Sequence, residues 1–277
     1  MKLPPQILLE LTYNCNHRCL FCSCPWLRFP ELKGTELDAA EWISVLKLLS
    51  EHGVKHIIFT GGEPLIKKDF VEILTYAAEL PFQSVSVYSN GLLMNDEMLD
   101  LFQKYHIEWA TSLPGILSFD SLTGSSGTVW QLLKKVRSAS RRGIPVMVSM
   151  TTVRKNQWEV SAAAMLAKFF GASSFSIGAC MPEGRALEHP EFYLSDKQYK
   201  KLLSTATKLN TILGIPVRFS YEQRCGCYNE DGTPTGSVPE SCPAGKEFIV
   251  ISPDGYVRKC MHSPEKIDPI TEYITKE

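Results

Sequence analysis

The sequence predicts an α/β protein in which a parallel sheet, covered outside by helices, curves into most of a barrel. Apolar strand-like segments alternate regularly with amphipathic helical segments, an order typical of parallel sheets. The chain has 277 residues, of which 44% are hydrophobic, and its formal net charge is −1. A chain of this size and composition can bury a large core and is not disordered.

The elements follow one another in a fixed order. Strands are expected at residues 6–12, 56–60, 84–89, 107–112, 145–152 and 173–178, with a further one near 216–219. Helices are expected at residues 38–52, 69–80, 96–104, 128–142, 157–170 and 196–213. At the first helix, Asp38 and Glu41 have the spacing of a capping box. Six strand–helix units are too few for a closed eight-stranded barrel but enough for most of one.

The composition changes near the C-terminus. Residues 224–246 are rich in Gly, Pro, Ser and Asn. Segments 248–252 and 256–259 then flank Pro253-Asp254-Gly255, which predicts a hairpin with a tight turn. We therefore divide the chain into a core domain, residues 1–223, and a small metal-stapled appendage, residues 224–277.

Several classes of protein are excluded. No apolar run approaches the ~20 residues that span a bilayer. Pro4, Pro5 and Glu10 interrupt any signal-peptide core at the N-terminus. A net charge of −1 argues against a broad nucleic-acid surface. We expect a cytoplasmic protein without a membrane or nucleic-acid partner.

Nine cysteines stand out, and eight of them form two clusters. The first cluster is Cys15, Cys19, Cys22 and Cys24, and the second is Cys225, Cys227, Cys242 and Cys260. In a cytoplasmic chain such clusters indicate metal or redox chemistry rather than disulfides. Cys180 stands alone and is expected to pack as a small apolar side chain.

The first cluster has the spacing C-x3-C-x2-C. Three thiolates on one tight loop, from Cys15, Cys19 and Cys22, can hold three irons of a [4Fe–4S] cluster and leave the fourth iron open. Cys24 would compete with Cys22 for one corner, because only Ser23 separates them. A zinc site that adds His17 or Cys24 is the alternative.

Other polar residues follow the predicted strands. They include Gly61-Gly62-Glu63-Pro64, Ser89-Asn90-Gly91, Ser112, Ser149 on the fifth strand, and Met181–Arg185. The ends of parallel strands meet at one rim of a barrel, where active sites lie. All candidate residues therefore point to the same rim.

These motifs resemble the radical S-adenosylmethionine (SAM) superfamily from about residue 6 to 215. Phe21 stands at the aromatic position of its C-x3-C-x-aromatic-C signature, and residues 61–64 match its GGEP motif. Residues 111–115 look like its S-L-D-G stretch, with Pro114 in place of the acidic residue. Residues 182–186 look like the P-x-G-R-A segment of the SPASM and Twitch branches, and Cys242-x12-Gly255-x4-Cys260 matches their C-terminal motif.

The resemblance implies a partial (β/α)6 TIM-like barrel with a Twitch-like iron–sulfur appendage. SAM would bind the open iron of a [4Fe–4S] cluster held by Cys15, Cys19 and Cys22. Gly61 and Gly62 would allow backbone to approach the methionyl group, and Glu63 would accept a hydrogen bond from its amino group. The other implied contacts are Phe21 near the adenine, Ser112 near the carboxylate, and Ser89, Asn90 and Ser149 as further cofactor-binding residues.

In the second cluster, the resemblance implies an auxiliary [4Fe–4S] cluster on Cys225, Cys227, Cys242 and Cys260. A structural zinc site with the same ligands is the alternative. His262 follows Cys260 and is expected to be exposed. Cys24 and Cys180 are candidates for returning a hydrogen atom to a substrate radical.

The function we predict is reductive cleavage of SAM to a 5′-deoxyadenosyl radical that abstracts hydrogen from a ribosomally made peptide or protein. The outcome would be a crosslink, an epimerisation or an oxidation. A flavodoxin or ferredoxin would donate electrons, and a separate protein would recognise a leader peptide. Alternatives are a small-molecule dehydrogenase, an enzyme of cofactor or antibiotic biosynthesis, and a non-catalytic iron–sulfur or zinc protein.

Overall fold

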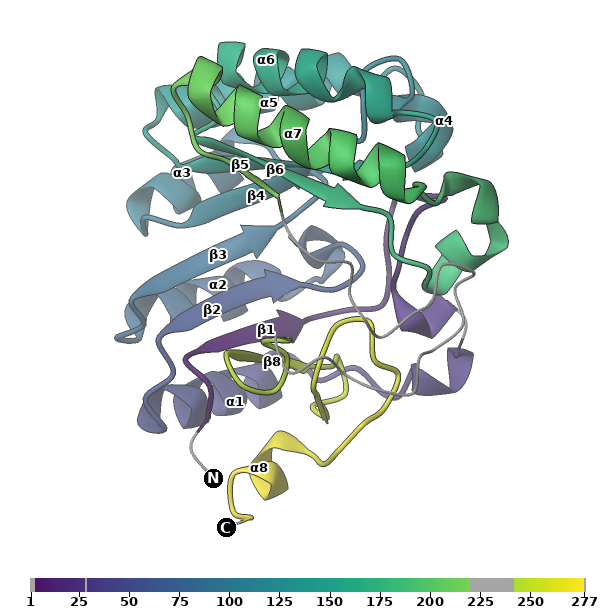
Figure 1. Cartoon of the computed structure of the whole chain (residues 1–277). Helices are drawn as coiled ribbons and strands as arrows, with labels where there is room; N and C mark the ends of the chain where they lie inside the picture. Colours follow the sequence, from purple (N-terminus) through teal and green to yellow (C-terminus); the bar gives the residue numbers. More distant parts are fainter. Residues whose placement is uncertain (1–2, 28, 220–241, 277) are drawn as a thin grey trace.

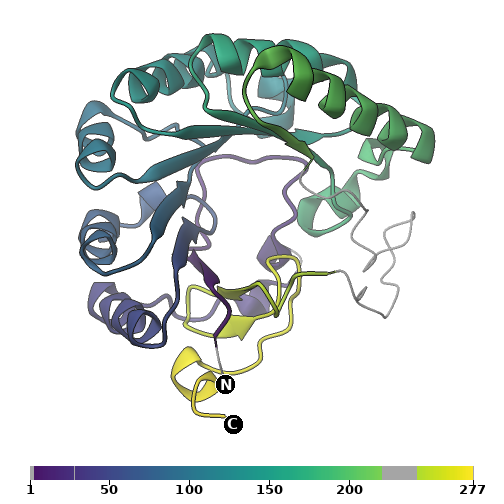
Figure 2. The ribbon, with the colours of Figure 1, turned by 60° about the vertical axis from the view of Figure 1, so that its left-hand side comes forward.

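Seven parallel strands lie side by side in the order of the chain. The computed structural model describes residues 3–27, 29–219 and 242–276. Within these residues, strands β1 to β7 form one curved sheet, which surrounds the barrel axis as an arc (Figure 2). Their bounds are Gln6–Glu10, His56–Thr60, Ser84–Tyr88, Glu108–Ser112, Val146–Thr152, Ser174–Ala179 and Val217–Phe219. The predicted α/β partial barrel is confirmed.

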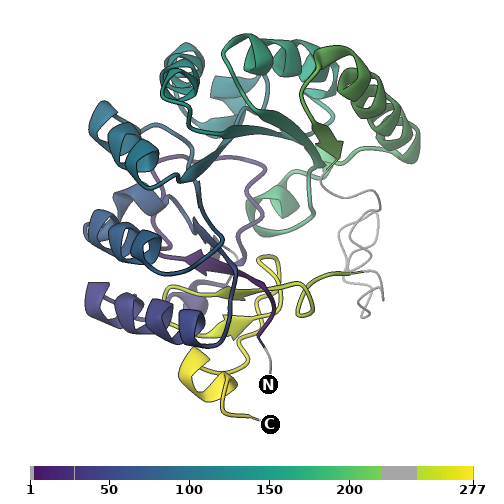
Figure 3. The same cartoon turned by 90° about the vertical axis from the view of Figure 1, so that its left-hand side faces the viewer.

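The helices cover the outer, convex face of this sheet (Figures 1 and 3). They are α1 Ala39–Glu51, α2 Phe70–Glu79, α3 Asp96–Lys104, α4 Phe119–Thr123, α5 Val129–Arg141, α6 Val160–Phe169, α7 Asp196–Leu213 and α8 Ile270–Tyr273. All six predicted helices are confirmed to within one turn. The short helix α4 was not predicted, because it lies in a loop without apolar periodicity. The capping box of Asp38 and Glu41 is present at the start of α1.

Successive side chains of each strand face opposite sides of the sheet. Ile7 and Leu9 on β1, like Phe59 on β2, face the helices and belong to the main hydrophobic core. Leu8, between them, faces the barrel interior with Ile58 and Val250. Glu10 has the same parity as Leu8, so a carboxylate lies on the interior face near the rim.

The C-terminal hairpin continues the barrel sheet. Strand β8, Phe248–Ile251, pairs in parallel with β1, and β9, Val257–Arg258, pairs antiparallel with β8. The predicted hairpin is thus confirmed, with Gly255 in its turn at a φ of 83°. The pairing covers the edge of β1 that an open barrel would otherwise expose. The predicted boundary at 223–224 lies outside the described residues and stays a prediction.

In the described parts of the chain, no helix is both long enough and apolar enough to cross a bilayer.

Candidate functional site at the carboxyl rim of the barrel

The loops after β1 and β2 are joined by backbone hydrogen bonds beyond the ends of the strands. The amide of Gly62 donates to the Thr12 carbonyl at 2.8 Å, and the amide of Glu63 donates to the Asn14 carbonyl at 2.7 Å. The cysteine loop and the Gly-Gly-Glu-Pro loop therefore form one unit. Sequence reasoning placed both at the rim but could not show that they pair.

The two glycines are required by this pairing. A Cβ at Gly62 would lie 2.1 Å from the Asn14 carbonyl oxygen, and one at Gly61 would lie 2.5 Å from the Thr12 carbonyl oxygen. Gly61 also has a φ of 129°, which favours glycine. The structure thus gives these glycines a role within the protein itself, while their predicted contact with SAM stays a prediction.

We expect Gly62→Ala to displace the cysteine loop, because the clash is with backbone that has no alternative rotamer. The cost should be about 1–3 kcal/mol of stability, as for other overpacked positions, together with a lower iron content after reconstitution. Gly53→Ala is the control. Its Cβ would meet nothing within 4 Å, although its φ is 74°, so it should lose stability without losing iron. Equal iron content in both variants would contradict the prediction.

The thiols of the first cluster project from the loop that follows β1. Cys15 is exposed, whereas Cys19 and Cys22 are partly buried. The sulfur of Cys15 accepts hydrogen bonds from the amide of His17 at 3.4 Å and from Asn90 Nδ2 at 4.0 Å. Burial raises the pKa of Cys19 to about 12. A hydrogen bond from the Cys24 thiol lowers the pKa of Cys22 to about 7, so Cys24 lies beside Cys22.

Glu63 connects three loops. It is fully buried, and burial raises the pKa of its carboxyl group. Its Oε1 accepts hydrogen bonds from Ser89 Oγ at 2.8 Å and the Leu65 amide at 3.1 Å, and its Oε2 accepts one from the Asn90 amide at 2.8 Å. Asn90 Nδ2 in turn donates to Asn16 Oδ1 at 2.7 Å. These contacts position the rim, and the predicted contacts of Glu63, Ser89 and Asn90 with SAM stay predictions.

Ser112 and Ser149 are brought together by strand register. They are direct partners in the pairing of β4 with β5, and both are partly buried. The amide of Leu113 donates to the Ser149 carbonyl at 2.7 Å. Their role as cofactor-binding residues stays a prediction.

The loop after Ser112 is held by Glu159, which the sequence analysis did not identify. Glu159 Oε2 accepts from the amides of Ile116 at 2.6 Å and Leu117 at 2.8 Å, and its Oε1 accepts from the amide and the hydroxyl of Ser118. Asn156 Nδ2 also donates to the Pro114 carbonyl at 3.0 Å. An acidic residue in the first turn of the helix predicted at residues 157–170 was the available signal, but it is equally typical of an ordinary helix start.

Glu159→Gln should release this loop, because an amide NH2 would face backbone N–H donors where the carboxylate now accepts. We expect a loss of about 1–3 kcal/mol in the free energy of unfolding and faster hydrogen exchange at the Ile116 and Leu117 amides. Glu247→Gln, at an exposed position, should change neither quantity. Unchanged exchange at both amides in Glu159→Gln would refute the anchoring role.

The segment after β6 also holds the cysteine loop. The amide of Arg185 donates to the Cys22 carbonyl and its Nη1 donates to the Cys19 carbonyl, both at 2.8 Å. Gly184 approaches closely, since a Cβ there would lie 2.6 Å from the Cys22 carbonyl oxygen. The sequence analysis placed residues 181–185 at the rim by position and related residues 182–186 to the superfamily by resemblance, but it did not predict these contacts. The structure shows that it braces the first cysteine cluster.

Phe21 and Cys180 lie in a second hydrophobic cluster beneath this loop, together with Leu122, Val153, Ala186 and Phe192. The expected packing of Cys180 is confirmed, because it is 8% exposed. Burial raises the pKa of Cys180 to about 12. The predicted contact of Phe21 with adenine and the hydrogen-donor roles of Cys24 and Cys180 stay predictions.

The second cysteine cluster is described only in part. Cys242 and Cys260 are partly buried, and the sulfur of Cys260 accepts a hydrogen bond from the His262 amide at 3.4 Å. Cys225 and Cys227 lie outside the described residues. The expectation that His262 is exposed was wrong. The residue is 9% exposed. Burial lowers the pKa of its imidazole to about 4, and a hydrogen bond with the Ser23 backbone opposes that shift.

A buried ion pair joins the hairpin to β1, and the sequence analysis missed it. Arg258 on β9 contacts Glu10 on β1, with side chains 2% and 3% exposed, and Arg258 Nη1 donates to the Ser263 carbonyl at 2.9 Å. Burial raises the pKa of Glu10, and the Arg258 guanidinium opposes that shift. The sequence feature that could have revealed this ion pair is Glu10, a single acidic residue at an inward-facing position of an otherwise apolar strand.

The family can now be assigned. The chain matches the family model of the radical SAM superfamily over residues 9–166, which is more than half of its length, and it belongs to this superfamily. The predicted superfamily is therefore confirmed.

Two curated proteins and a solved structure are similar to the chain. The sporulation killing factor maturation protein SkfB of Bacillus subtilis (strain 168) is 30% identical over 261 residues, which cover 93% of this chain and 60% of that protein. The PqqA peptide cyclase of Gluconobacter oxydans (strain 621H) is 26% identical over 272 residues, 96% of this chain and 72% of that protein. Streptococcus suis SuiB bound to S-adenosylmethionine has the same fold, with a TM-score of 0.73, 16% identity, and coverage of 96% of this chain and 63% of that one.

The superfamily implies SAM and a [4Fe–4S] cluster, and the residues present fit that pair. Three thiols come from one loop, and N–H donors point at the Cys15 sulfur, as hydrogen bonds to sulfur do in iron–sulfur sites. In the part of the chain that is described, no three His, Cys, Asp or Glu side chains are grouped to hold a single metal ion, whereas a [4Fe–4S] cluster takes its cysteines at separate irons.

Proposed function

We propose that this chain is the core of a radical SAM enzyme of the SPASM/Twitch type that modifies a ribosomally made peptide. The observation that carries the proposal is the loop of Cys15, Cys19 and Cys22, which the loops after β2, β3 and β6 hold by direct hydrogen bonds. Three thiols kept at fixed positions by three neighbouring loops suit a cluster that must keep one iron open. The chain spans 60% of the length of the SkfB protein, so the activity of the whole protein is part of the proposal.

Each rim residue has a part in this proposal. Cys15, Cys19 and Cys22 ligate the catalytic [4Fe–4S] cluster, and Gly61, Gly62 and Glu63 shape the surface that receives the methionyl end of SAM. Phe21, Ser89, Asn90, Ser112 and Ser149 complete the SAM site. When bound, the reduced cluster and SAM supply a 5′-deoxyadenosyl radical that abstracts a hydrogen atom from the substrate.

Peptide modification is supported by the relatives. SkfB is named a maturation protein, PqqA cyclase is named for a peptide, and SuiB has been solved with its precursor peptide SuiA. We extend this substrate class to the present chain. The electron donor would be a flavodoxin or ferredoxin, a separate protein would present the leader peptide, and the location would be the cytoplasm.

The proposal includes an auxiliary [4Fe–4S] cluster on Cys242 and Cys260, with ligands from Cys225 and Cys227. Its support is the spacing Cys242-x12-Gly255-x4-Cys260, together with the hairpin that presents Cys260 just after β9. A structural zinc ion on the same thiols is the outcome that would replace it.

Metal analysis and SAM cleavage test the proposal together. The protein is purified without oxygen and reconstituted, its iron, sulfide and zinc are counted, and 5′-deoxyadenosine is measured after reduction with dithionite. We expect about eight irons with matching sulfide per chain and formation of 5′-deoxyadenosine. About four irons and one zinc would retain the radical chemistry and replace the auxiliary cluster with a zinc site. Zinc without iron, together with no cleavage of SAM, would overturn the proposal that the chain is a radical SAM enzyme.

A further inference from the structure

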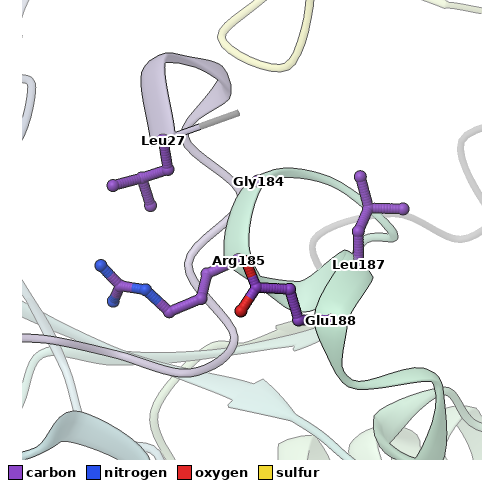
Figure 4. Close-up of a pocket in the computed structure, with 5 residues that line it drawn as sticks. All are labelled: Leu27, Gly184, Arg185, Leu187 and Glu188. Atoms are coloured by element: carbon purple, nitrogen blue, oxygen red, sulfur yellow. The ribbon is translucent and has the colours of Figure 1, made fainter. Parts of the chain in front are cut away.

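A cavity of about 420 Å³ opens beside the cysteine loop, between the short helices Pro25–Leu27 and Gly184–Glu188. Leu27, Gly184, Arg185, Leu187 and Glu188 line it (Figure 4). Its volume lies within the ~300–1,000 Å³ typical of ligand sites. None of its lining residues is among those predicted to bind SAM or an iron–sulfur cluster.

The walls combine apolar and charged groups. Leu27 and Leu187 are partly buried and contribute aliphatic surface from the two helices, whereas Arg185 is partly buried and Glu188 is exposed. Within the described ranges, neither Arg185 nor Glu188 forms an ion pair. The Arg185 guanidinium and the Glu188 carboxylate therefore line one cavity, and each can form an ion pair or a hydrogen bond with a bound ligand.

Arg185 is held in place. Its backbone amide donates a hydrogen bond to the Cys22 carbonyl, and its Nη1 donates one to the Cys19 carbonyl. A guanidinium carries five N–H donors, so the contact with Cys19 leaves other donors for a ligand. A pre-positioned guanidinium suits a carboxylate, which it can bind through two parallel hydrogen bonds.

We propose that this cavity binds a segment of the peptide substrate in which an acidic side chain adjoins an aliphatic one. The carboxylate pairs with Arg185, the aliphatic side chain packs between Leu27 and Leu187, and Glu188 accepts a backbone N–H of the segment. Because Arg185 also holds the Cys19 and Cys22 carbonyls, a segment bound here lies directly beside the catalytic loop. The inference rests on the proposed function, since it requires a peptide substrate.

Selection of binding peptides tests the proposal without requiring turnover. The reconstituted protein with SAM is immobilised and challenged with a library of short random peptides displayed on their mRNA. We expect peptides with an acidic residue next to an aliphatic residue to be enriched. Arg185→Gln should reduce the enrichment of acidic over neutral residues roughly tenfold or more, as expected for loss of a charged hydrogen bond.

Two further variants separate binding in the cavity from general damage to the cysteine loop. Glu188→Lys adds a positive charge to the cavity and should raise the preference for acidic residues, whereas Leu187→Asp should remove the aliphatic preference. Glu72→Lys makes the same charge change at an exposed position of α2 and should leave both preferences unaltered. General damage to the fold would weaken both preferences in both variants. It would not raise the acidic preference in Glu188→Lys and remove the aliphatic preference in Leu187→Asp.

The outcomes distinguish the two levels of the proposal. Peptides enriched with the same residue preferences in the wild type and in all cavity variants would overturn the cavity assignment and leave peptide modification intact. No enrichment of any peptide by the wild type would overturn the peptide substrate and the cavity assignment together.

Discussion

Cys19→Ala is expected to remove about four irons per reconstituted chain, because two thiolates cannot hold the cluster that three hold. Formation of 5′-deoxyadenosine should fall roughly 100-fold or more, since even groups that only orient metal ligands are worth 10–100-fold. The measurement is iron and sulfide content, followed by chromatography of the reaction products.

Cys180→Ala is the matched control for this variant. Cys19 packs against the same hydrophobic cluster that contains Cys180, so both variants remove a sulfur from similar surroundings. Cys180→Ala should keep its iron. Full iron content in Cys19→Ala would exclude Cys19 as a ligand, and loss of zinc in place of iron would support the zinc alternative.

Arg258→Met should destabilise the protein by about 3–5 kcal/mol, because it leaves the carboxylate of Glu10 buried without its partner. The free energy of unfolding is measured with urea on the metal-free protein. Replacing both partners, as Glu10→Leu with Arg258→Met, should recover much of this loss, since apolar residues fill a buried site without a desolvation cost.

The loss in Arg258→Met should depend on pH. Burial already raises the pKa of Glu10, and removing Arg258 removes the charge that opposes the shift. A carboxyl whose pKa is raised by folding contributes most stability below its unfolded value and loses it as the pH rises. The deficit should therefore be largest at neutral pH and shrink as the pH falls toward 4.5, the ordinary pKa of the group.

The exposed pair of Lys47 and Glu51 provides the comparison. Their charged atoms are 4.0 Å apart, with side chains 66% and 58% exposed. Lys47→Met should change stability by about 0.5 kcal/mol or less. A loss no greater than this in Arg258→Met would show that the buried pair does not hold the hairpin against β1.

The sequence by itself determined the order of strands and helices and the rim that carries the site. Periodicity and capping are local properties, so Asp38 with Glu41 was enough to locate the start of α1. The spacing of Cys15, Cys19 and Cys22 and the Gly61–Pro64 motif were likewise enough to predict the superfamily. In a parallel sheet, the loops after successive strands must meet at one edge, whatever the details of packing.

Only the tertiary structure decided which residues hold that rim together. Glu159 carries four hydrogen bonds from a loop more than forty positions earlier in the chain, and Arg185 reaches back to Cys19 across 166 positions. The pairing of β8 with β1, the ion pair of Arg258 with Glu10 and the burial of His262 are equally long-range. Such contacts depend on where the barrel brings distant segments together, and no local pattern of residue types encodes that position.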